Sequence, residues 1–315
     1  MEVLYFFEKI RIPVLNEFML MITKLGEETA FLVVALILFW CIDKQRGYYV
    51  LSVGFLGTIF SQFLKLFCRI PRPWVADENF TILEQAREAA EGYSFPSGHT
   101  QSAVGVFGSL ANTEKRKWLR WLFIILAALV GISRVYIGVH TPVDVIVGAA
   151  ISVLLLLVFR PIIMKEGRDL SVLIGIMNLI AAGYLAYVEL YPFPADMDVH
   201  NMESGLKNAY TLLGCILGMN VIYYFDTRWL KFPVNAVWWA QVLKVVGGLA
   251  VVLAVKEGLR TPLEMLFGDP LSARLVRYFL LVVVAGAVWP LTFRFFAKLG
   301  LTQKNCNICR EDDHE

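Results

Sequence analysis

Three short polar stretches interrupt a chain that is otherwise strongly apolar, at residues 65–73, 93–99 and 133–144. Together they hold four bases and two of the chain's four histidines. Ionisable side chains beside long apolar runs are costly unless they pair with one another or serve a site. Lysine and arginine suit an anionic ligand, and histidine can act as nucleophile or general acid. The combination predicts a site that handles phosphate.

Five residues of these stretches are predicted to bind the phosphate. Lys65, Arg72 and Arg134 form a cationic triad suited to three phosphate oxygens, and an arginine can bind two oxygens at once. Ser97 and Gly98 stand at the expected start of a helix, where backbone N–H groups point outward and the helix dipole favours an anion. In a simpler interpretation, Lys65 only snorkels from its helix end, the arginines contact lipid head groups and Ser97 only caps its helix.

Three further residues are predicted to do the chemistry. His140 precedes Asp144 by four residues, and a carboxylate near a histidine fixes its tautomer and leaves the other ring nitrogen as a nucleophile. His99 remains to protonate the leaving oxygen. Asp144 also stands three residues after Thr141 at an expected helix start, so it can cap that helix and orient the histidine together. The predicted site transfers a phosphoryl group with no metal and no cofactor.

These motifs resemble the three-part signature of the type 2 phosphatidic acid phosphatase superfamily. The matching patterns are Lys-x6-Arg-Pro at 65–73, Pro-Ser-Gly-His at 96–99 and Ser-Arg-x5-His-x3-Asp at 133–144. The resemblance covers roughly residues 25–160. It implies a helical core with its site at the outer face, a phosphohistidine intermediate on His140, His99 as the acid and Asp144 as the orienting group. It also implies that phosphate is held by Lys65, Arg72, Ser97, Gly98 and Arg134.

The elements that must position these residues are membrane helices. Of the 315 residues, 57% are hydrophobic and 18% are charged, whereas soluble proteins carry about a quarter charged residues. This composition excludes a disordered chain and a disulfide-stapled secreted module. Nine apolar stretches approach the roughly 20 residues that a membrane helix needs. They lie near 25–42, 47–68, 97–112, 118–138, 142–160, 169–190, 205–225, 236–256 and 276–297. We therefore predict an all-α, polytopic bundle of about nine transmembrane helices.

The distribution of charge predicts the orientation of the bundle. Lysine and arginine collect in the odd-numbered connections, as at Lys115, Arg116 and Lys117, and this is typical of the cytoplasmic side. The even-numbered connections 74–91 and 189–203 are acidic. The N-terminus is therefore expected outside and the C-terminus inside, with all three polar stretches at outer ends of spans.

Four segments are expected along the chain. Residues 1–24 have apolar residues at helical spacing and are predicted as an interfacial amphipathic helix, or as an extension of the first span. Residues 25–164 form the phosphatase core, 165–300 add four transmembrane helices, and 301–315 are a cytoplasmic tail. This order of core and extra spans resembles the layout of the sphingosine-1-phosphate phosphatase branch. In the tail, Cys306 and Cys309 are half a zinc site or a free thiol pair.

The predicted function is hydrolysis of a lipid phosphate or pyrophosphate at the extracytoplasmic face. Polyprenyl pyrophosphate, a phosphatidate-like lipid and a sphingoid phosphate all fit as substrates, and nucleic acid is not expected as a partner. The expected location is a bacterial inner membrane, or the endoplasmic reticulum of a eukaryote. One alternative is a lipid phosphotransferase that uses the same intermediate, and another is a lipid transporter or scramblase formed by the C-terminal spans. Those spans could also wall a lipid entrance or form a homodimer interface.

Overall fold

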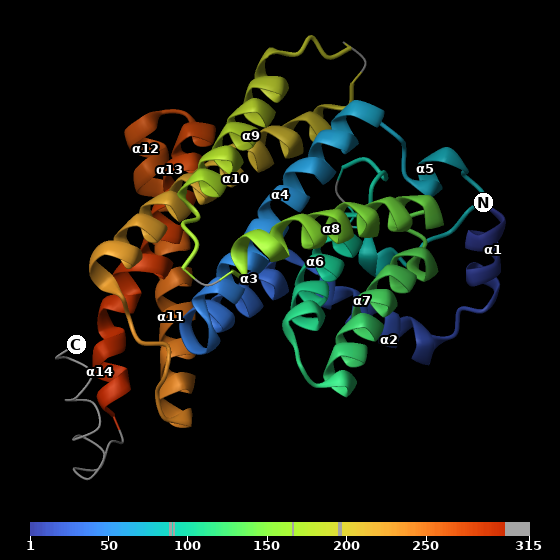
Figure 1. The fold of residues 1–315 in the computed structure, drawn as a ribbon. Helices are drawn as coiled ribbons and strands as arrows, with labels where there is room; N and C mark the ends of the chain where they lie inside the picture. Colours follow the sequence, from blue (N-terminus) through green and yellow to red (C-terminus); the bar gives the residue numbers. More distant parts are fainter. Residues whose placement is uncertain (88–89, 91, 166, 195–196, 300–315) are drawn as a thin grey trace.

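The computed structural model describes residues 1–87, 90, 92–165, 167–194 and 197–299, and in these residues the chain is helical with no strand (Figure 1). The helices are α1 Glu2–Lys9, α2 Pro13–Thr23, α3 Glu28–Ile37, α4 Lys44–Cys68, α5 Pro73–Ala76, α6 Gly98–Thr113, α7 Lys117–Ile137, α8 Pro142–Ile163, α9 Ser171–Leu190, α10 Val199–Phe225, α11 Trp238–Gly258, α12 Arg260–Phe267, α13 Pro270–Val283 and α14 Phe293–Lys298. The pair Cys306 and Cys309 lies outside the described residues.

The all-helical prediction is confirmed, and each of the nine predicted apolar stretches contains a helix. In the described part of the chain, six segments are long and apolar enough by themselves to cross a membrane. They are Lys44–Ala76, Lys117–Ile137, Pro142–Ile163, Ser171–Leu190, Trp238–Phe267 and Pro270–Lys298. Pro13–Gly26 and Glu28–Ile42 make a seventh only if counted together, because they meet at a bend of 54°. The helices α6, with 16 residues, and α10 do not qualify individually.

The N-terminal segment differs from the single helix expected over residues 1–24. It contains two helices, because Pro13 forces the residue before it into an extended conformation. Ile12 has φ −131° and ψ 150°, and Pro13 then occupies the first turn of α2, where its missing N–H is not needed. The turn brings Arg11 beside the end of α7, where its guanidinium donates hydrogen bonds to the carbonyl oxygens of Tyr136 and Ile137.

The helices α4, α6, α7 and α8 form the first packed unit, in which α6 contacts the other three. Close approach is possible because glycines face their neighbours. A Cβ on Gly57 of α4 would lie 2.0 Å from the Gln101 side chain of α6, and a Cβ on Gly148 of α8 would lie 2.5 Å from the carbonyl oxygen of Ser97. The second contact holds the start of α8 against the start of α6, where two of the polar stretches meet.

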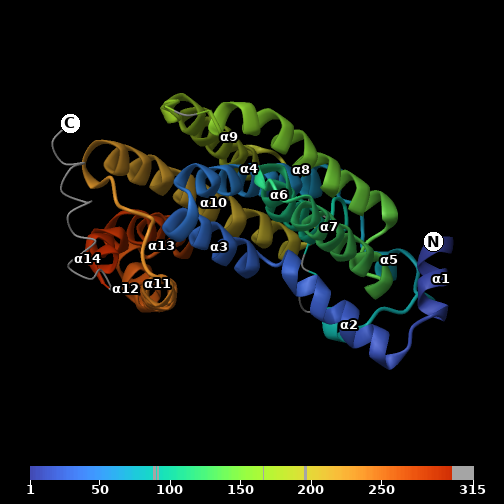
Figure 2. The same cartoon turned by 60° about the horizontal axis from the view of Figure 1, so that its bottom comes forward.

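The helices α9 to α14 form a second unit at the end of the molecule opposite α1 and α2 (Figure 2). Within it α10 packs on α13, and Gly214 and Gly218 of α10 lie directly against the backbone of α13. The two units join where α10 packs along α4. The ammonium of Lys44 at the start of α4 lies 2.8 Å from the carboxylate of Asp226, just after α10. Gly205 near the other end of α10 contacts Leu66 of α4, so these two helices are antiparallel.

We predict that Gly148→Ala lowers the melting temperature of the purified protein in detergent. The new methyl group overpacks the α6–α8 contact at a cost of about 1–3 kcal/mol, each kcal/mol corresponding to roughly 2–4 °C. Gly175→Ala in α9 is the matched control, because no atom lies within 4 Å of the position of its new Cβ. Equal melting temperatures for the two variants would contradict the prediction.

Candidate active site

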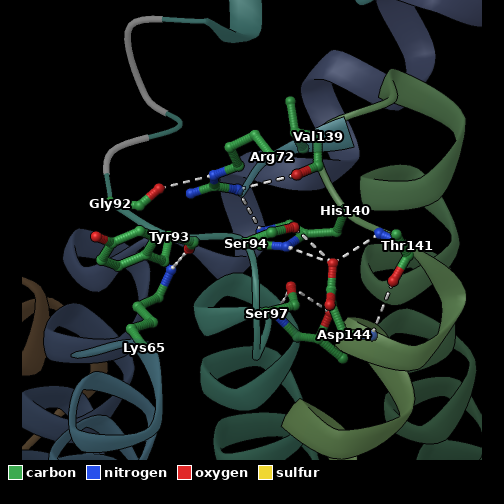
Figure 3. A network of polar contacts seen from close by, with 11 residues as sticks. Lys65, Arg72, Gly92, Tyr93, Ser94, Ser97, Val139, His140, Thr141 and Asp144 are labelled. Carbon is green, nitrogen blue, oxygen red and sulfur yellow. Dashed lines mark hydrogen bonds and ion pairs between the residues drawn. The ribbon is translucent and has the colours of Figure 1, made fainter. Parts of the chain in front are cut away.

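The structure brings the three polar stretches together at one end of the first unit (Figure 3). Lys65 is in the last turn of α4, Arg72 directly precedes α5, and Arg134 is in the last turn of α7. His99 is in the first turn of α6, and His140 lies between α7 and α8. All five line one cavity of about 640 Å³. Residues up to 75 positions apart in the chain therefore face the same space.

Tight turns at the helix ends place His140. The helix α7 ends at Gly138, whose φ of +93° is accessible to glycine and strained for other residues. A Cβ at this position would also lie 2.8 Å from the Arg11 guanidinium and 2.9 Å from the Phe80 ring. Two residues later the chain reaches His140, and Thr141 then caps α8.

The guanidinium of Arg72 holds the His140 ring. Its Nη1 lies 2.9 Å from the carbonyl oxygen of Val139 and 2.9 Å from Nε2 of His140. A guanidinium can only donate, so Nε2 is the acceptor and the ring proton is assigned to Nδ1. Burial, and then the charge of Arg72, lower the pKa of His140 well below its usual range. The imidazole is therefore neutral, with the Nε2 lone pair directed at the cationic side of the site.

Asp144 has both functions that its position in the sequence allows. Its Oδ2 accepts hydrogen bonds from the backbone N–H of Thr141 at 2.8 Å and from the Ser94 hydroxyl at 2.6 Å, and it lies 3.6 Å from Nδ1 of His140. The Thr141 hydroxyl accepts from the backbone N–H of Asp144, which completes a capping box at the start of α8. The position of the carboxylate is thus fixed by contacts other than the one with the imidazole.

The two residues at the start of α6 differ in their access to the cavity. The backbone N–H of Ser97 donates to the carbonyl oxygen of Asp144 at 2.9 Å, so it is engaged inside the protein. The Ser97 hydroxyl accepts from Thr100, and Ser97 is fully buried. Gly98 lines the cavity, and no atom lies within 4 Å of the position where its Cβ would be. Of the two residues predicted to hold phosphate through the backbone, only Gly98 lines the cavity.

Lys65 and Arg134 are buried cations held by neutral oxygens. The ammonium of Lys65 donates to the carbonyl oxygen of Tyr93, and Nη1 of Arg134 donates to the Thr23 hydroxyl at 2.7 Å. Nε of Arg134 is buried without a hydrogen-bond partner. Buried charges are stable only when they are well compensated, and a phosphate in the cavity would supply the missing negative charge.

Sequence reasoning did not identify Ser94 or Thr23 as parts of the site. Ser94 lies inside the second polar stretch, and its place three residues before Ser97 was the only available signal. Thr23 lies in α2, 111 residues before its partner Arg134, and no local pattern marks it.

Away from the histidines the cavity becomes largely apolar and passes between the two units. Its wall there is formed by α3, α4, α10 and α13, with residues such as Leu32, Phe55, Leu212, Leu281 and Val282. The volume falls within the range of about 300–1,000 Å³ that is usual for small-molecule sites. The cavity therefore offers a cationic end and an apolar end to a single ligand.

Comparison with known proteins finds two family models along the chain. The PAP2 superfamily model matches residues 45–168, and a model described as "PAP2 superfamily phosphatase, transmembrane extension" matches residues 210–304. The first covers the three polar stretches. The second lies in the unit formed by α9 to α14, which the signature itself does not include.

The chain is also similar to curated proteins whose names describe phosphatases of lipid phosphates or diphosphates. The undecaprenyl-diphosphatase BcrC of Bacillus subtilis is 30% identical over 113 residues, 36% of this chain and 55% of the relative. Phosphatidylglycerophosphatase B of Bacillus subtilis is 31% identical over 159 residues, 46% of this chain and 74% of the relative. The sphingosine-1-phosphate phosphatase 1 of Rattus norvegicus is 28% identical over 147 residues, 45% of this chain and 33% of the relative. The chain thus spans about half the length of BcrC.

We predict that inorganic phosphate raises the melting temperature of the purified protein. A ligand at 100 times its dissociation constant adds about 2.7 kcal/mol of stability. Arg134→Gln should lose most of this shift, because the amide can still bond Thr23 but carries no charge. Arg116→Gln is the control, since Arg116 is exposed beyond the other end of α7. A shift of equal size in the two variants would exclude Arg134 from the anion site.

Proposed function

Because this chain belongs to the PAP2 superfamily, we propose that it is an integral membrane phosphatase that hydrolyses a lipid phosphate or pyrophosphate. One observation carries the proposal. A single cavity joins a cationic end, with two histidines, to an apolar passage between the two helical units. A ligand that fills it must have an anionic head and a hydrocarbon tail. The named activities of the relatives, on undecaprenyl diphosphate, phosphatidylglycerophosphate and sphingosine 1-phosphate, support the same class of substrate.

In the first step, the lone pair of His140 Nε2 attacks phosphorus while the bond from phosphorus to the lipid oxygen breaks. The leaving oxygen takes a proton from His99. In the structure Nε2 is paired with Arg72. A phosphate oxygen is a stronger acceptor for a guanidinium than a neutral imidazole is, so substrate binding draws Arg72 onto the phosphate and frees the attacking nitrogen.

In the second step, His99 takes a proton from water, and the resulting nucleophile breaks the bond between phosphorus and Nε2. Inorganic phosphate leaves, and both histidines return to their starting protonation states. Lys65, Arg72 and Arg134 with the backbone N–H of Gly98 stabilise the charge on the phosphoryl oxygens in both transition states. Asp144 stabilises the positive imidazole that forms in the first step. Ser97 contributes by capping α6.

We further propose that the bundle has nine spans, with the site at the extracytoplasmic face. The concentration of lysine and arginine in the odd-numbered connections supports this orientation. The short α6 crosses within the first unit, where α4, α7 and α8 surround it. In this arrangement α1 and α2 lie at the outer interface, residues 25–164 are the phosphatase core and 165–300 are the extension. The membrane is a bacterial inner membrane or the endoplasmic reticulum.

The test is phosphate release by the purified protein from a panel of lipid phosphates and pyrophosphates, with and without a chelator. We expect free phosphate from at least one lipid, no effect of the chelator, and loss of turnover in His140→Ala. Substantial activity in His140→Ala would overturn the nucleophile assignment. Transfer of labelled phosphate to a second lipid or a sugar, in place of release, would indicate the phosphotransferase alternative.

A separate prediction concerns the acid. His99→Ala should slow hydrolysis of a lipid phosphate by about 10²–10⁴-fold, the usual contribution of a general acid or base. The loss should be smaller in the first step for a nitrophenyl phosphate ester, whose leaving group needs no proton. Rapid-mixing measurement of the nitrophenol burst isolates that step. An equal loss of the burst rate and the lipid rate would assign His99 to binding.

A further inference from the structure

A group of polar side chains continues from the phosphate site into the cavity along α4 and α10. Ser61 and Gln62 of α4 and Ser204 and Asn208 of α10 all line the cavity. We call these four residues the polar belt. In the described part of the chain none of the four side chains has a hydrogen-bond partner. Ser61 is only 2% exposed, with its hydroxyl buried and unpaired.

The packing of the two helices sets the level of the polar belt. A Cβ on Gly205 would lie 2.7 Å from the Leu66 side chain, so α10 touches α4 beside Lys65. Because the helices are antiparallel, the next turn of α10 places Asn208 at the level of Gln62 and Ser61. One helical turn is about 5.4 Å along the axis. The belt thus lies about one turn from the ammonium that is predicted to hold phosphate.

Deeper in the cavity no side chain offers a free polar group of this kind along the two helices. The Thr58 hydroxyl donates to the carbonyl oxygen of Gly54 at 2.9 Å, and the Thr211 hydroxyl donates to that of Lys207 at 2.7 Å. Beyond them the lining from α4 and α10 is apolar, with Phe55, Leu51, Leu212, Met219 and Ile222. Along α4 and α10, the unpaired hydrogen-bonding groups that line the cavity therefore lie in the zone directly behind the phosphate site.

We propose that the polar belt is a subsite for the backbone of the substrate, and that it selects lipid monophosphates whose phosphate is attached to a hydroxyl-, amine- or ester-bearing backbone. This inference rests on the proposed function. A glycerol or sphingoid backbone places such groups within a few atoms of the phosphate, where Ser61, Gln62 and Asn208 can bond them. A polyprenyl chain is hydrocarbon from its first carbon, and it would leave the belt buried and unpaired. Sites built to hydrogen-bond a ligand discriminate strongly against analogues that lack the group.

The belt also assigns a role to the C-terminal extension. Ser204 and Asn208 come from α10, outside the segment that carries the three catalytic motifs. The extension therefore contributes directly to substrate choice by completing the wall of the cavity next to the phosphate. The phosphate site itself remains entirely within the first unit.

The experiment compares kcat/KM on two single-chain monophosphates, lysophosphatidate and farnesyl phosphate. Wild-type protein should prefer lysophosphatidate. Asn208→Leu should lower kcat/KM on lysophosphatidate by about tenfold or more and leave farnesyl phosphate unchanged or improved. Ser61→Ala removes a single oxygen and should shift the ratio in the same direction by a smaller factor. The matched control is Asn178→Leu on α9, whose side chain bonds the carbonyl of Ile174 outside the cavity, and it should leave the ratio unchanged.

Three results would overturn the inference. A wild-type preference for farnesyl phosphate is the first. The second is an equal loss on both substrates in Asn208→Leu and Ser61→Ala, with folding verified by the melting temperature, since this would make the belt structural. In both cases the proposed phosphatase function stands. The third is the absence of phosphate release by wild-type protein from any lipid, which would overturn the proposed function together with this inference.

Discussion

Three cations buried close together, with the carboxylates of Asp144 and Glu27 nearby, are the constraint around which the site is built. Lys65 and Arg72 are 6% exposed and Arg134 is 1% exposed, yet all three line the same cavity. Like charges in a dry environment repel one another strongly. The protein holds them largely with neutral groups, among them the carbonyl oxygens of Tyr93 and Val139 and the Thr23 hydroxyl. Their charge is therefore left for a ligand, and an anion with several oxygens suits that need.

The surrounding structure keeps those neutral groups in place. Val139 follows the left-handed turn at Gly138, where Arg11 packs over the end of α7. The carboxylate of Asp144 is held by Ser94 and by its own capping box, so it reaches the His140 ring without moving onto an arginine. Gly148 lets α8 approach α6 closely enough for the Ser97 N–H to bond Asp144. Helix capping and glycine packing thus both fix the positions of the hydrogen-bond donors around the cavity.

The second helical unit extends the cavity beyond its cationic end. Without α10 and α13 the cationic end would open onto the side of α4. With them the cavity continues as a passage. Its lining from α4 and α10 is polar next to the cationic end and largely apolar beyond it. The salt bridge from Lys44 to Asp226 and the contact between Gly205 and Leu66 fix α10 along α4 at both ends. The extension therefore forms the wall of the cavity where, in our proposal, the part of a lipid next to its phosphate would bind.

The sequence by itself determined the helical membrane class and the catalytic motifs, because apolar runs, helix caps and residue spacing are local properties. It also indicated that Asp144 could cap α8 and orient His140, since both partners lie within four residues. Pro13, which divides the N-terminal segment, is local too, but the apolar periodicity across it favoured one helix. Only the tertiary structure decided that α10 shares the cavity. It also decided that Asp144 is held by Ser94, Arg134 by Thr23 and His140 by Arg72. Those contacts join residues 50, 111 and 68 positions apart, and they exist only once the helices have packed.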